Sequence, residues 1–326
     1  MLRDGGTPVQ QASALQTLNN WRSCHAYPIN TFNATLRNKV SVVSPTAIVA
    51  QRLKRAPSIV SKLQRFHAMK LSTMQDIGGL RGVVKTNKQV YRLLQNYLSS
   101  RFDHELVVAR DYIKNPKTSG YRSVHLVYKY RNKREPHYDG LQIELQIRNR
   151  VQHAWATAVE TMGTFLDHSL KSSEGPSEWL NFFSLSGSAF AHLEGTTPVS
   201  GYEHLSRLET FQACESAAQS LDVRNRLRAF TVAANEISKG KSGTYHLIIL
   251  NMDRRSVSIT SFAKSNLDAA NIEYSKTESL IADGGQIQAV LVAAGSIDNL
   301  RRAYPNYFLD TDAFVKQLDV IAKHAG

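Results

Sequence analysis

Residues 111–125 bring together side chains that a nucleotide-binding site needs. The segment contains three cationic side chains, an aromatic ring and an imidazole, around a turn that Pro116 stiffens and Gly120 allows to bend. Cationic groups neutralise phosphates, and an aromatic ring can stack on a base. The segment therefore predicts a site for a phosphorylated nucleotide.

A second basic segment precedes it. Apolar residues within 46–70 recur near one helical face, which predicts an amphipathic helix with lysine and arginine on its other face. Lys54, Ser58 and Lys62 are four residues apart and would share a face, with Arg52 just before them. Two ammonium groups and a hydroxyl suit the phosphates of a nucleoside triphosphate. The alternative is a solvated charged face.

Two carboxylates lie at or within predicted strands. Asp76 comes just before an apolar run that contains Arg81, and Glu144 lies inside a run that alternates polar and apolar residues. If the two strands are neighbours, the carboxylates form a hard-oxygen site that suits Mg²⁺ with bound phosphate. The alternative is that Asp76 caps a turn and Glu144 pairs with Arg148.

The apolar patterning predicts the elements that hold these residues. Four runs rich in branched residues predict strands of one sheet, at residues 80–84, 106–109, 124–130 and 141–147. Helical patterns follow the first and the last of these runs, at residues 90–99 and 151–170. A sheet with flanking helices predicts an α/β (α+β) domain that ends near residue 170.

The second half of the chain has a different pattern. A loop is predicted at residues 172–177, and a helix at 212–239 ends at the stop signal Gly240. Beyond Gly240 we expect a small β-β-α-β-α-α unit whose strands lie at 245–252, 257–262 and 287–292. The predicted parts are a domain over residues 1–170, a helical linker over 171–239 and a C-terminal domain over 240–326.

The amino-acid composition indicates which kinds of partner and cofactor the chain can have. The chain has 326 residues and a formal net charge of +13, which favours polyanionic partners such as nucleotides and RNA. Cys24 and Cys214 are its only cysteines, so we expect no disulfide framework and no zinc site. We found no apolar leader and no apolar run long enough to span a bilayer, so we expect a cytoplasmic protein with no membrane partner.

Five motifs, in order, resemble the synthetase domain of the RelA/SpoT family. They are Arg-x-Lys-x-x-x-Ser-x-x-x-Lys from Arg52, Asp-Ile-Gly-Gly-Leu-Arg from Asp76, the 111–125 segment, Glu-Leu-Gln-Ile-Arg from Glu144, and His-Ala-Trp-Ala from His153. The resemblance covers roughly residues 45–165. It implies a nucleotidyltransferase-like domain with a mixed β-sheet, and transfer of the β,γ-diphosphate of ATP to a ribose 3′-hydroxyl.

The resemblance also implies roles for residues on the donor side. Arg52 and Arg81 would sandwich the adenine of ATP. Lys54, Ser58 and Lys62 would hold its phosphates.

On the acceptor side, the resemblance implies that Asp76 and Glu144 hold Mg²⁺ and that Glu144 takes the 3′-hydroxyl proton. Tyr121 would stack on the acceptor base. The other residues implied to bind the acceptor are Arg110, Lys117, His125, Gln146 and His153. For Trp155 we favour a place in the core. Because the chain has no His-Asp dipeptide, we expect no hydrolase activity of the kind found in long RelA/SpoT proteins.

Small synthetases of this kind divide into alarmone synthetases, which modify GDP or GTP, and toxic members, which modify the 3′ end of tRNA. The basic run at residues 131–134 could bind a single-stranded phosphate backbone, which favours tRNA as the acceptor. The alternative for this run is a charged hairpin turn. A third hypothesis is an inactive RNA-binding regulator, although the presence of both Asp76 and Glu144 argues against it.

Tyr304 and Tyr307 lie three residues apart around Pro305. The segment resembles the Tyr-x-x-Tyr element of the CapRel family, fused toxin–antitoxin proteins of phage defence. By this resemblance the two rings would enter the adenine pocket, and a phage capsid protein would release them. The alternative is that both rings belong to the core of an accessory domain. The leading hypothesis is thus a self-inhibited tRNA pyrophosphokinase.

Overall fold

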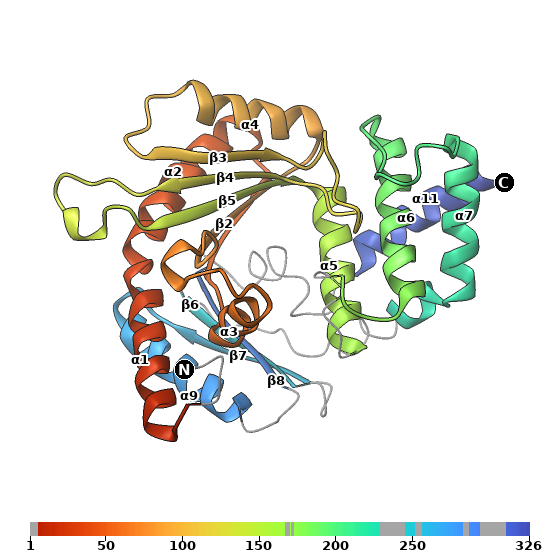
Figure 1. The fold of residues 1–326 in the computed structure, drawn as a ribbon. Helices are drawn as coiled ribbons and strands as arrows, with labels where there is room; N and C mark the ends of the chain where they lie inside the picture. The colour runs from red at the N-terminus through yellow and green to blue at the C-terminus, as the bar shows by residue number, and fades with distance from the viewer. Residues whose placement is uncertain are drawn as a thin grey trace.

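The computed structural model describes residues 6–166, 170, 173–227, 245–251, 256–282, 287–293 and 311–326. They form a mixed β-sheet with flanking helices, beside which lies a separate group of helices (Figure 1). The strands are β1 Ile48–Leu53, β2 Gly78–Val84, β3 Glu105–Asp111, β4 Val124–Lys129, β5 Gln142–Asn149, β6 Tyr245–Asn251, β7 Ser256–Phe262 and β8 Ile287–Ala293. The α-helices are α1 Pro8–Cys24, α2 Ala26–Val43, α3 Ala56–Arg65, α4 Asn87–Ser99, α5 Arg150–Phe165, α6 Ser177–Glu194, α7 Arg207–Ser220, α9 Leu267–Ala282 and α11 Asp312–Ala325.

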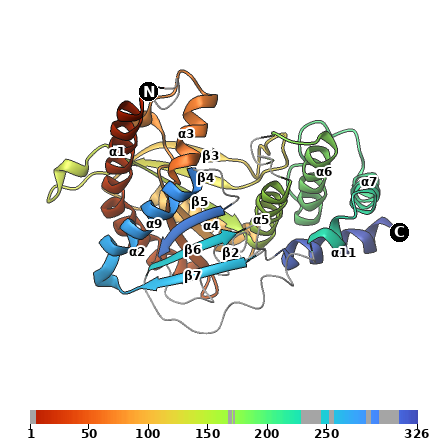
Figure 2. The same cartoon turned by 90° about the horizontal axis from the view of Figure 1, so that it is seen from below.

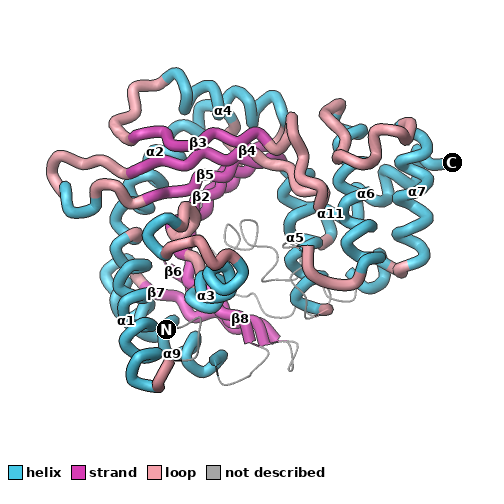
Figure 3. Tube along the Cα trace, viewed as in Figure 1, coloured by secondary structure: helices cyan, strands magenta, loops and turns pink. Residues whose placement is uncertain are grey.

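The eight strands form one sheet in the order β3-β4-β5-β2-β1-β8-β6-β7 (Figure 3). β2 and β5 are parallel, and the other neighbouring pairs are antiparallel. The mixed α+β fold expected from the sequence is therefore confirmed. None of the described helices is long and apolar enough to cross a membrane.

Helices α2 and α4 pack against the sheet and bury its apolar side chains. Strand β5 shows the alternation that this packing requires, because Ile143, Leu145 and Ile147 are almost completely buried while the residues between them are more exposed along most of the strand. The apolar face of the sheet is thus covered, and the polar side chains of the same strands lie on its other face.

The separate group of helices consists of α5, α6, α7 and α11 (Figures 1 and 2). Its core contains Phe182, Phe183 and Phe190 of α6, and the ring of Phe314 on α11 lies 5.4–6.2 Å from those three rings. The last helix of the chain is therefore part of the core of this group.

The predicted C-terminal elements are largely confirmed. β6 and β7 form an antiparallel hairpin, and α9, β8 and α11 follow in the expected order. The stop signal Gly240 and the helix expected between β8 and α11 lie outside the described residues. β8 pairs with β1, so the C-terminal strands extend the sheet that the N-terminal half begins. The boundaries at residues 170 and 239 stay a proposal.

One sequence prediction about the basic segment is wrong. Residues 46–70 do not form one helix, because residues 48–53 form β1 and the helix begins only at Ala56. Arg52 therefore lies on a strand, and Lys54 follows that strand rather than sharing a helix with Ser58 and Lys62. The physical reason is that β1 gains backbone hydrogen bonds from both β2 and β8, whereas Pro57 favours a helix start at this point.

The prediction of one continuous helix at 212–239 is wrong within its described part, where the chain breaks after α7 and is helical again at residues 223–227, and residues 228–239 lie outside the described residues. α7 begins at Arg207 and ends at Ser220, and Asp222 just beyond it has a positive φ of 50°, which a continuous helix does not allow. Three long helices were not predicted from the sequence at all, namely α1, α2 and α6.

Candidate active site

The polar face of the sheet brings six of the predicted site residues together. Residues paired across neighbouring strands project to the same face. Arg110 on β3 pairs with His125 on β4, and His125 pairs with Gln146 on β5. Gln146 in turn pairs with Arg81 on β2. The next row contains Glu144 on β5, Gly79 on β2 and Arg52 on β1. Residues predicted from four separate motifs therefore share one surface.

Gly79 leaves open space in the middle of this surface. Among the described residues, a Cβ atom built on Gly79 would meet only the backbone oxygen of Arg52, at 3.7 Å. Arg52 pairs with Gly79, and Arg81 lies two residues further along β2, so the two arginines are diagonal neighbours on one face. Diagonal neighbours in a sheet lie about 7–8 Å apart. This spacing suits a flat ring held between two guanidinium groups.

Asp76 lies just before β2 and binds both lysines of the basic segment. Its Oδ2 atom lies 2.8 Å from Nζ of Lys54, and its Oδ1 atom lies 2.9 Å from Nζ of Lys62. Burial would raise the pKa of Asp76, but Lys54 and Lys62 together hold that pKa well below its usual range. Burial lowers the pKa of Lys54, and Asp76 only partly offsets this. Ser58 is half-buried on α3, on the same helix as Lys62.

Glu144 belongs to a closed ring of five hydrogen-bonded side chains. Its Oε1 atom accepts from Nδ1 of His125 at 2.9 Å, and its Oε2 atom accepts from Nε2 of Gln146 at 2.8 Å. The hydroxyl of Tyr121 lies 2.6 Å from Nε2 of His125. Nη2 of Arg148 closes the ring by donating to the Tyr121 hydroxyl at 2.7 Å and to Oε1 of Gln146 at 2.9 Å.

The pKa directions in this ring agree with one another. Burial lowers the pKa of His125, and Glu144 only partly offsets this. Burial would raise the pKa of Glu144, but its hydrogen bond to His125 and the positive field there hold that pKa below its usual value. Burial raises the pKa of Tyr121. A neutral imidazole therefore donates from Nδ1 to an ionised Glu144 and accepts from the Tyr121 hydroxyl at Nε2.

Arg148 connects the ring rather than neutralising Glu144. The alternative pairing of Glu144 with Arg148 is not what the structure has, because both carboxylate oxygens accept from His125 and Gln146. Arg148 is completely buried, and its guanidinium carbon lies 5.1 Å from the centroid of the Tyr121 ring. Sequence analysis gave Arg148 no site role. The strict alternation of residues 144, 146 and 148 along one strand face could have predicted it.

The other residues predicted to bind the acceptor surround this ring. Nζ of Lys117 lies 4.7 Å from the Tyr112 ring and 5.3 Å from the Tyr121 ring. Partial burial lowers the pKa of Lys117, and the nearby Glu144 charge partly offsets this. Arg110 is exposed on β3, and His153 is buried on α5. Trp155 lies in the core, where its Nε1 donates to the backbone oxygen of Phe183, as we expected.

The two carboxylates fit a magnesium site. Mg²⁺ is usually held by one or two carboxylates together with water and substrate phosphates. The pKa values of Asp76 and Glu144 both lie below their usual values, so both groups are ionised, and the negative charge of Asp76 acts in the opposite direction on the pKa of Glu144. Among the described residues, no cluster of three or more His, Cys, Asp or Glu side chains could hold a metal. The residues present fit an ion that a bound nucleotide helps to hold.

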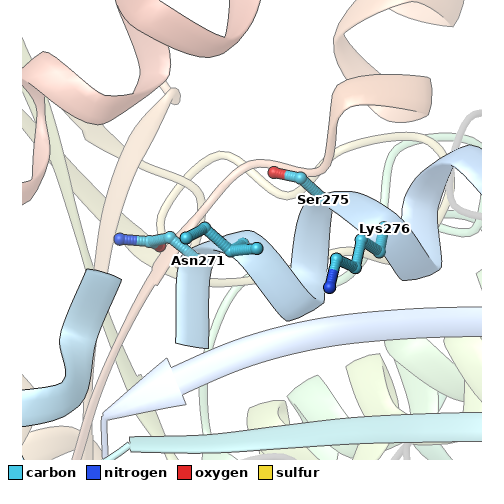
Figure 4. Close-up of a pocket in the computed structure, with 4 residues that line it drawn as sticks. Asn271, Ser275 and Lys276 are labelled. Carbon is cyan, nitrogen blue, oxygen red and sulfur yellow. The ribbon is translucent and has the colours of Figure 1, made fainter. Parts of the chain in front are cut away.

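A pocket of about 390 Å³ lies elsewhere, over α9, where its described lining residues are Asn271, Ile272, Ser275 and Lys276 (Figure 4). All four belong to one helix, and none is a carboxylate or a residue predicted for nucleotide binding. The pocket is therefore not the candidate active site.

Comparison with known proteins agrees with this geometry. Residues 51–164 match the family model described as the region found in RelA / SpoT proteins. The chain is 36% identical over 116 residues to the GTP pyrophosphokinase YjbM of Bacillus subtilis, and 30% identical over 120 residues to the GTP pyrophosphokinase YwaC of the same organism. These matches cover 35% of this chain, and 54% and 56% of the two relatives. The chain thus spans just over half the length of the curated relatives it matches.

Solved structures of similar proteins include small alarmone synthetase 1 from Bacillus subtilis bound to pppGpp, with 26% identity, a TM-score of 0.45, and coverage of 52% of this chain and 89% of that chain. A GTP pyrophosphokinase family protein from Streptococcus pneumoniae is 25% identical, with a TM-score of 0.44 and coverage of 52% and 85%. The match to the family model confirms the RelA/SpoT resemblance for residues 51–164, which contain the five motifs. The CapRel-like assignment of the C-terminal part stays a prediction.

Proposed function

We propose that the chain is a pyrophosphokinase of the RelA/SpoT type, which uses ATP as the donor of a diphosphate. The observation that carries the proposal is the shared polar face of the sheet, on which Arg52, Arg81 and Glu144 surround the open space above Gly79. Phosphoryl chemistry depends mainly on positioning and on neutralising charge, and this face supplies both.

Binding of ATP would exchange one set of ionic contacts for another. Lys54 and Lys62 are paired with Asp76 in the ligand-free protein. A triphosphate carries more negative charge than a carboxylate, so both ammonium groups would turn to the phosphates and leave Asp76 to bind Mg²⁺. Bound Mg²⁺ would neutralise charge on the transferred phosphates. Arg52 and Arg81 would hold the adenine ring through cation–π and stacking contacts.

In the reaction, the acceptor 3′-oxygen would bond to the β-phosphorus of ATP while the bond from that phosphorus to the α,β-bridging oxygen breaks, and AMP would leave. Glu144 would take the 3′-hydroxyl proton. Its carboxylate is ionised in the ligand-free protein, so it can accept this proton. Tyr121, held by His125 and Arg148, would stack on the acceptor base.

For the acceptor we propose the 3′ end of tRNA. The net charge of +13 supports a polyanionic acceptor. Lys133 and Arg134 are exposed in the turn after β4, where a phosphate backbone could reach them. Arg131, in contrast, pairs with Glu105 at 3.0 Å. This ion pair agrees with the alternative interpretation of the basic run as a charged hairpin turn.

GDP or GTP is the second candidate acceptor. The matched curated relatives are named GTP pyrophosphokinases, and the family model matches residues 51–164, which include the residues of the polar face. The same pocket around Tyr121 would then hold guanine instead of the terminal base of tRNA.

We further propose that the C-terminal part inhibits the site. The backbone of Arg52 pairs with Val292 of β8, and Nη2 of Arg22 on α1 lies 3.2 Å from the hydroxyl of Tyr274 on α9. These contacts support a C-terminal part that rests against the proposed donor site. Tyr304 and Tyr307, the proposed inhibitory rings, lie outside the described residues. The proposal that a phage capsid protein is the activator rests on the family resemblance alone.

A labelling experiment tests these proposals together. The full chain is incubated with Mg²⁺, ATP labelled at the γ-phosphate, and either uncharged tRNA or GDP and GTP. Label on tRNA supports the first acceptor, and label on guanosine nucleotides alone supports the second. A full chain with Tyr304 and Tyr307 both changed to Ala should label faster if these rings inhibit, and this variant keeps α11 in the helical group. Absence of label in every sample, together with binding of RNA, would instead indicate the inactive regulator.

A further inference from the structure

Helix α6 holds the loop between β3 and β4, residues 112–123, which contains Tyr121 and is called the β3–β4 loop here. Ser184 of α6 donates to the backbone oxygen of Thr118 over 2.6 Å. At the same junction, Trp155 of α5 donates from Nε1 to the backbone oxygen of Phe183 and is edge-on to the Tyr121 ring. The loop is therefore tied to α6 directly and through α5.

Two glycines allow the backbones of the loop and the helix to touch. A Cβ atom on Gly187 of α6 would lie 2.6 Å from both Cα and the backbone oxygen of Gly120. A Cβ atom on Gly120 would lie 2.5 Å from the backbone oxygen of Phe183. Gly120 also has a φ of 91°, which side-chain-bearing residues rarely adopt. Any larger residue at position 187 must push the loop and the helix apart.

The end of α6 makes a third contact, to the residue after Tyr121. Arg122 is almost completely buried, and its Nη1 atom lies 2.5 Å from Oε2 of Glu194, the last residue of α6. The other oxygen of Glu194 accepts a hydrogen bond from Asn149, the last residue of β5. Glu194 thus fixes the end of the loop against the strand that contains Glu144.

We propose that α6 is the support of the β3–β4 loop and that Gly187 and Glu194 are positioning residues for the acceptor. This inference rests on the proposed function, because it concerns the same site. Both residues lie outside residues 51–164, the region that matches the RelA/SpoT family model. They hold Tyr121, which is buried, so that its hydroxyl meets His125 in the hydrogen-bonded ring around Glu144. The segment that sequence analysis predicted to be a linker therefore sets the geometry of acceptor binding.

The support extends to the end of the chain. Phe314 of α11 packs on Phe182, Phe183 and Phe190, which lie on α6. Phe183 is also the residue whose backbone oxygen limits the space at Gly120. The C-terminal helix α11 thus helps to fix the position of α6. Through α6 it also supports the β3–β4 loop.

The test compares Gly187→Ala with Gly201→Ala in the full chain. Gly201 has a φ of 99° between α6 and α7, and a Cβ atom there would meet nothing within 4 Å, so its substitution strains the same helical group without touching the loop. In Gly187→Ala we expect amide hydrogen exchange of residues 114–123 to become faster and the acceptor KM to rise roughly tenfold to a hundredfold. ATP affinity, measured by calorimetry with a non-hydrolysable analogue, should stay as in the unsubstituted chain.

Ser184→Ala and Glu194→Gln provide a second route if Gly187→Ala does not fold. Each should raise the acceptor KM with little change in ATP affinity. The proposal is overturned if Gly187→Ala and Gly201→Ala change loop exchange and KM equally, or if the Ser184 and Glu194 variants weaken ATP and acceptor to the same extent. If neither the unsubstituted chain nor the variant with Tyr304 and Tyr307 changed to Ala labels an acceptor, the proposed function fails, while the exchange measurement still decides whether α6 holds the loop.

Discussion

His125 donates from Nδ1 to Oε1 of Glu144 over 2.9 Å, between paired strands β4 and β5. This contact fixes the imidazole tautomer and keeps the carboxylate ionised, because an N–H donor stabilises a carboxylate and not a carboxylic acid. The carboxylate that the proposed reaction needs is therefore prepared before any substrate binds.

Glu144→Gln should abolish transfer and leave the fold intact. The amide oxygen can still accept from His125, but the side chain can neither take a proton nor supply charge to a metal. We expect a rate loss of at least about 100-fold, measured with labelled ATP and the preferred acceptor. Glu105→Gln is the control, because Glu105 lies on edge strand β3 and pairs only with exposed cations. An active Glu144→Gln enzyme would contradict the proposed role of this residue.

Tyr121→Phe should weaken catalysis and stability while keeping the stacking ring. Loss of the hydroxyl removes partners of His125 and Arg148 in a buried site, which costs about 1–3 kcal/mol in unfolding free energy. Thermal unfolding and the rate constant kcat should both fall, with a smaller change in the acceptor KM. Tyr112→Phe is the matched control. The aromatic ring of Tyr112 contacts His125 edge-on, but Tyr112 is not one of the five hydrogen-bonded side chains around Glu144. Equal effects of both substitutions would argue against the ring of five side chains.

Two adjacent glycines should have opposite effects. Gly79→Val fills the open space on the polar face, so we expect weaker ATP binding in calorimetry with little loss of stability. Gly78→Ala acts on the apolar face, where its Cβ atom would lie 2.7 Å from Cδ1 of Ile143, and should cost about 1–3 kcal/mol of stability. Unchanged ATP affinity in Gly79→Val would exclude this space as the nucleotide site.

The pKa of Asp76 predicts a stability change in acid. Its pKa is lower in the folded chain than the value of about 3.9 in an unfolded chain, so the Asp76 pairs contribute fully above that pH and are lost as pH falls further. At pH 7 we expect Asp76→Asn to cost about 1–3 kcal/mol, because it leaves two partly buried lysines without their partner. Urea unfolding should show this difference shrinking as the pH falls below about 4, towards the lowered pKa of Asp76 in the folded chain. A difference that does not change with pH would contradict the assignment.

The sequence predicted which side chains come together better than the elements that hold them. Asp76 and Glu144 were expected to share a site if their strands are neighbours, and β2, which follows Asp76, pairs with β5, which contains Glu144. The error at residues 46–53 has a tertiary cause, since the helical spacing of apolar residues there competes with two neighbouring strands that no local pattern reveals. The predicted common helix face for Lys54, Ser58 and Lys62 was wrong, yet Lys54 and Lys62 still meet at Asp76.

Helix α6 could not be recognised because it has no polar stripe. Small and apolar residues occupy most sides of α6, and Ser184, Ser186 and Ser188 are buried, so the periodicity of an amphipathic helix is absent. The contact of Gly187 with Gly120 joins residues that are far apart in sequence. Such contacts follow from the packing of the helical group rather than from local propensity.

Pairing of β8 with β1 has a consequence for any state in which the C-terminal part leaves. β1 is an interior strand only because β8 occupies its second edge, and departure of β8 would expose unsatisfied amide and carbonyl groups beside Arg52. An exposed strand edge readily accepts an extended peptide from another protein. Release of the C-terminal strands would therefore leave β1 with an unpaired edge next to the proposed donor site, and a strand from another chain could pair with that edge.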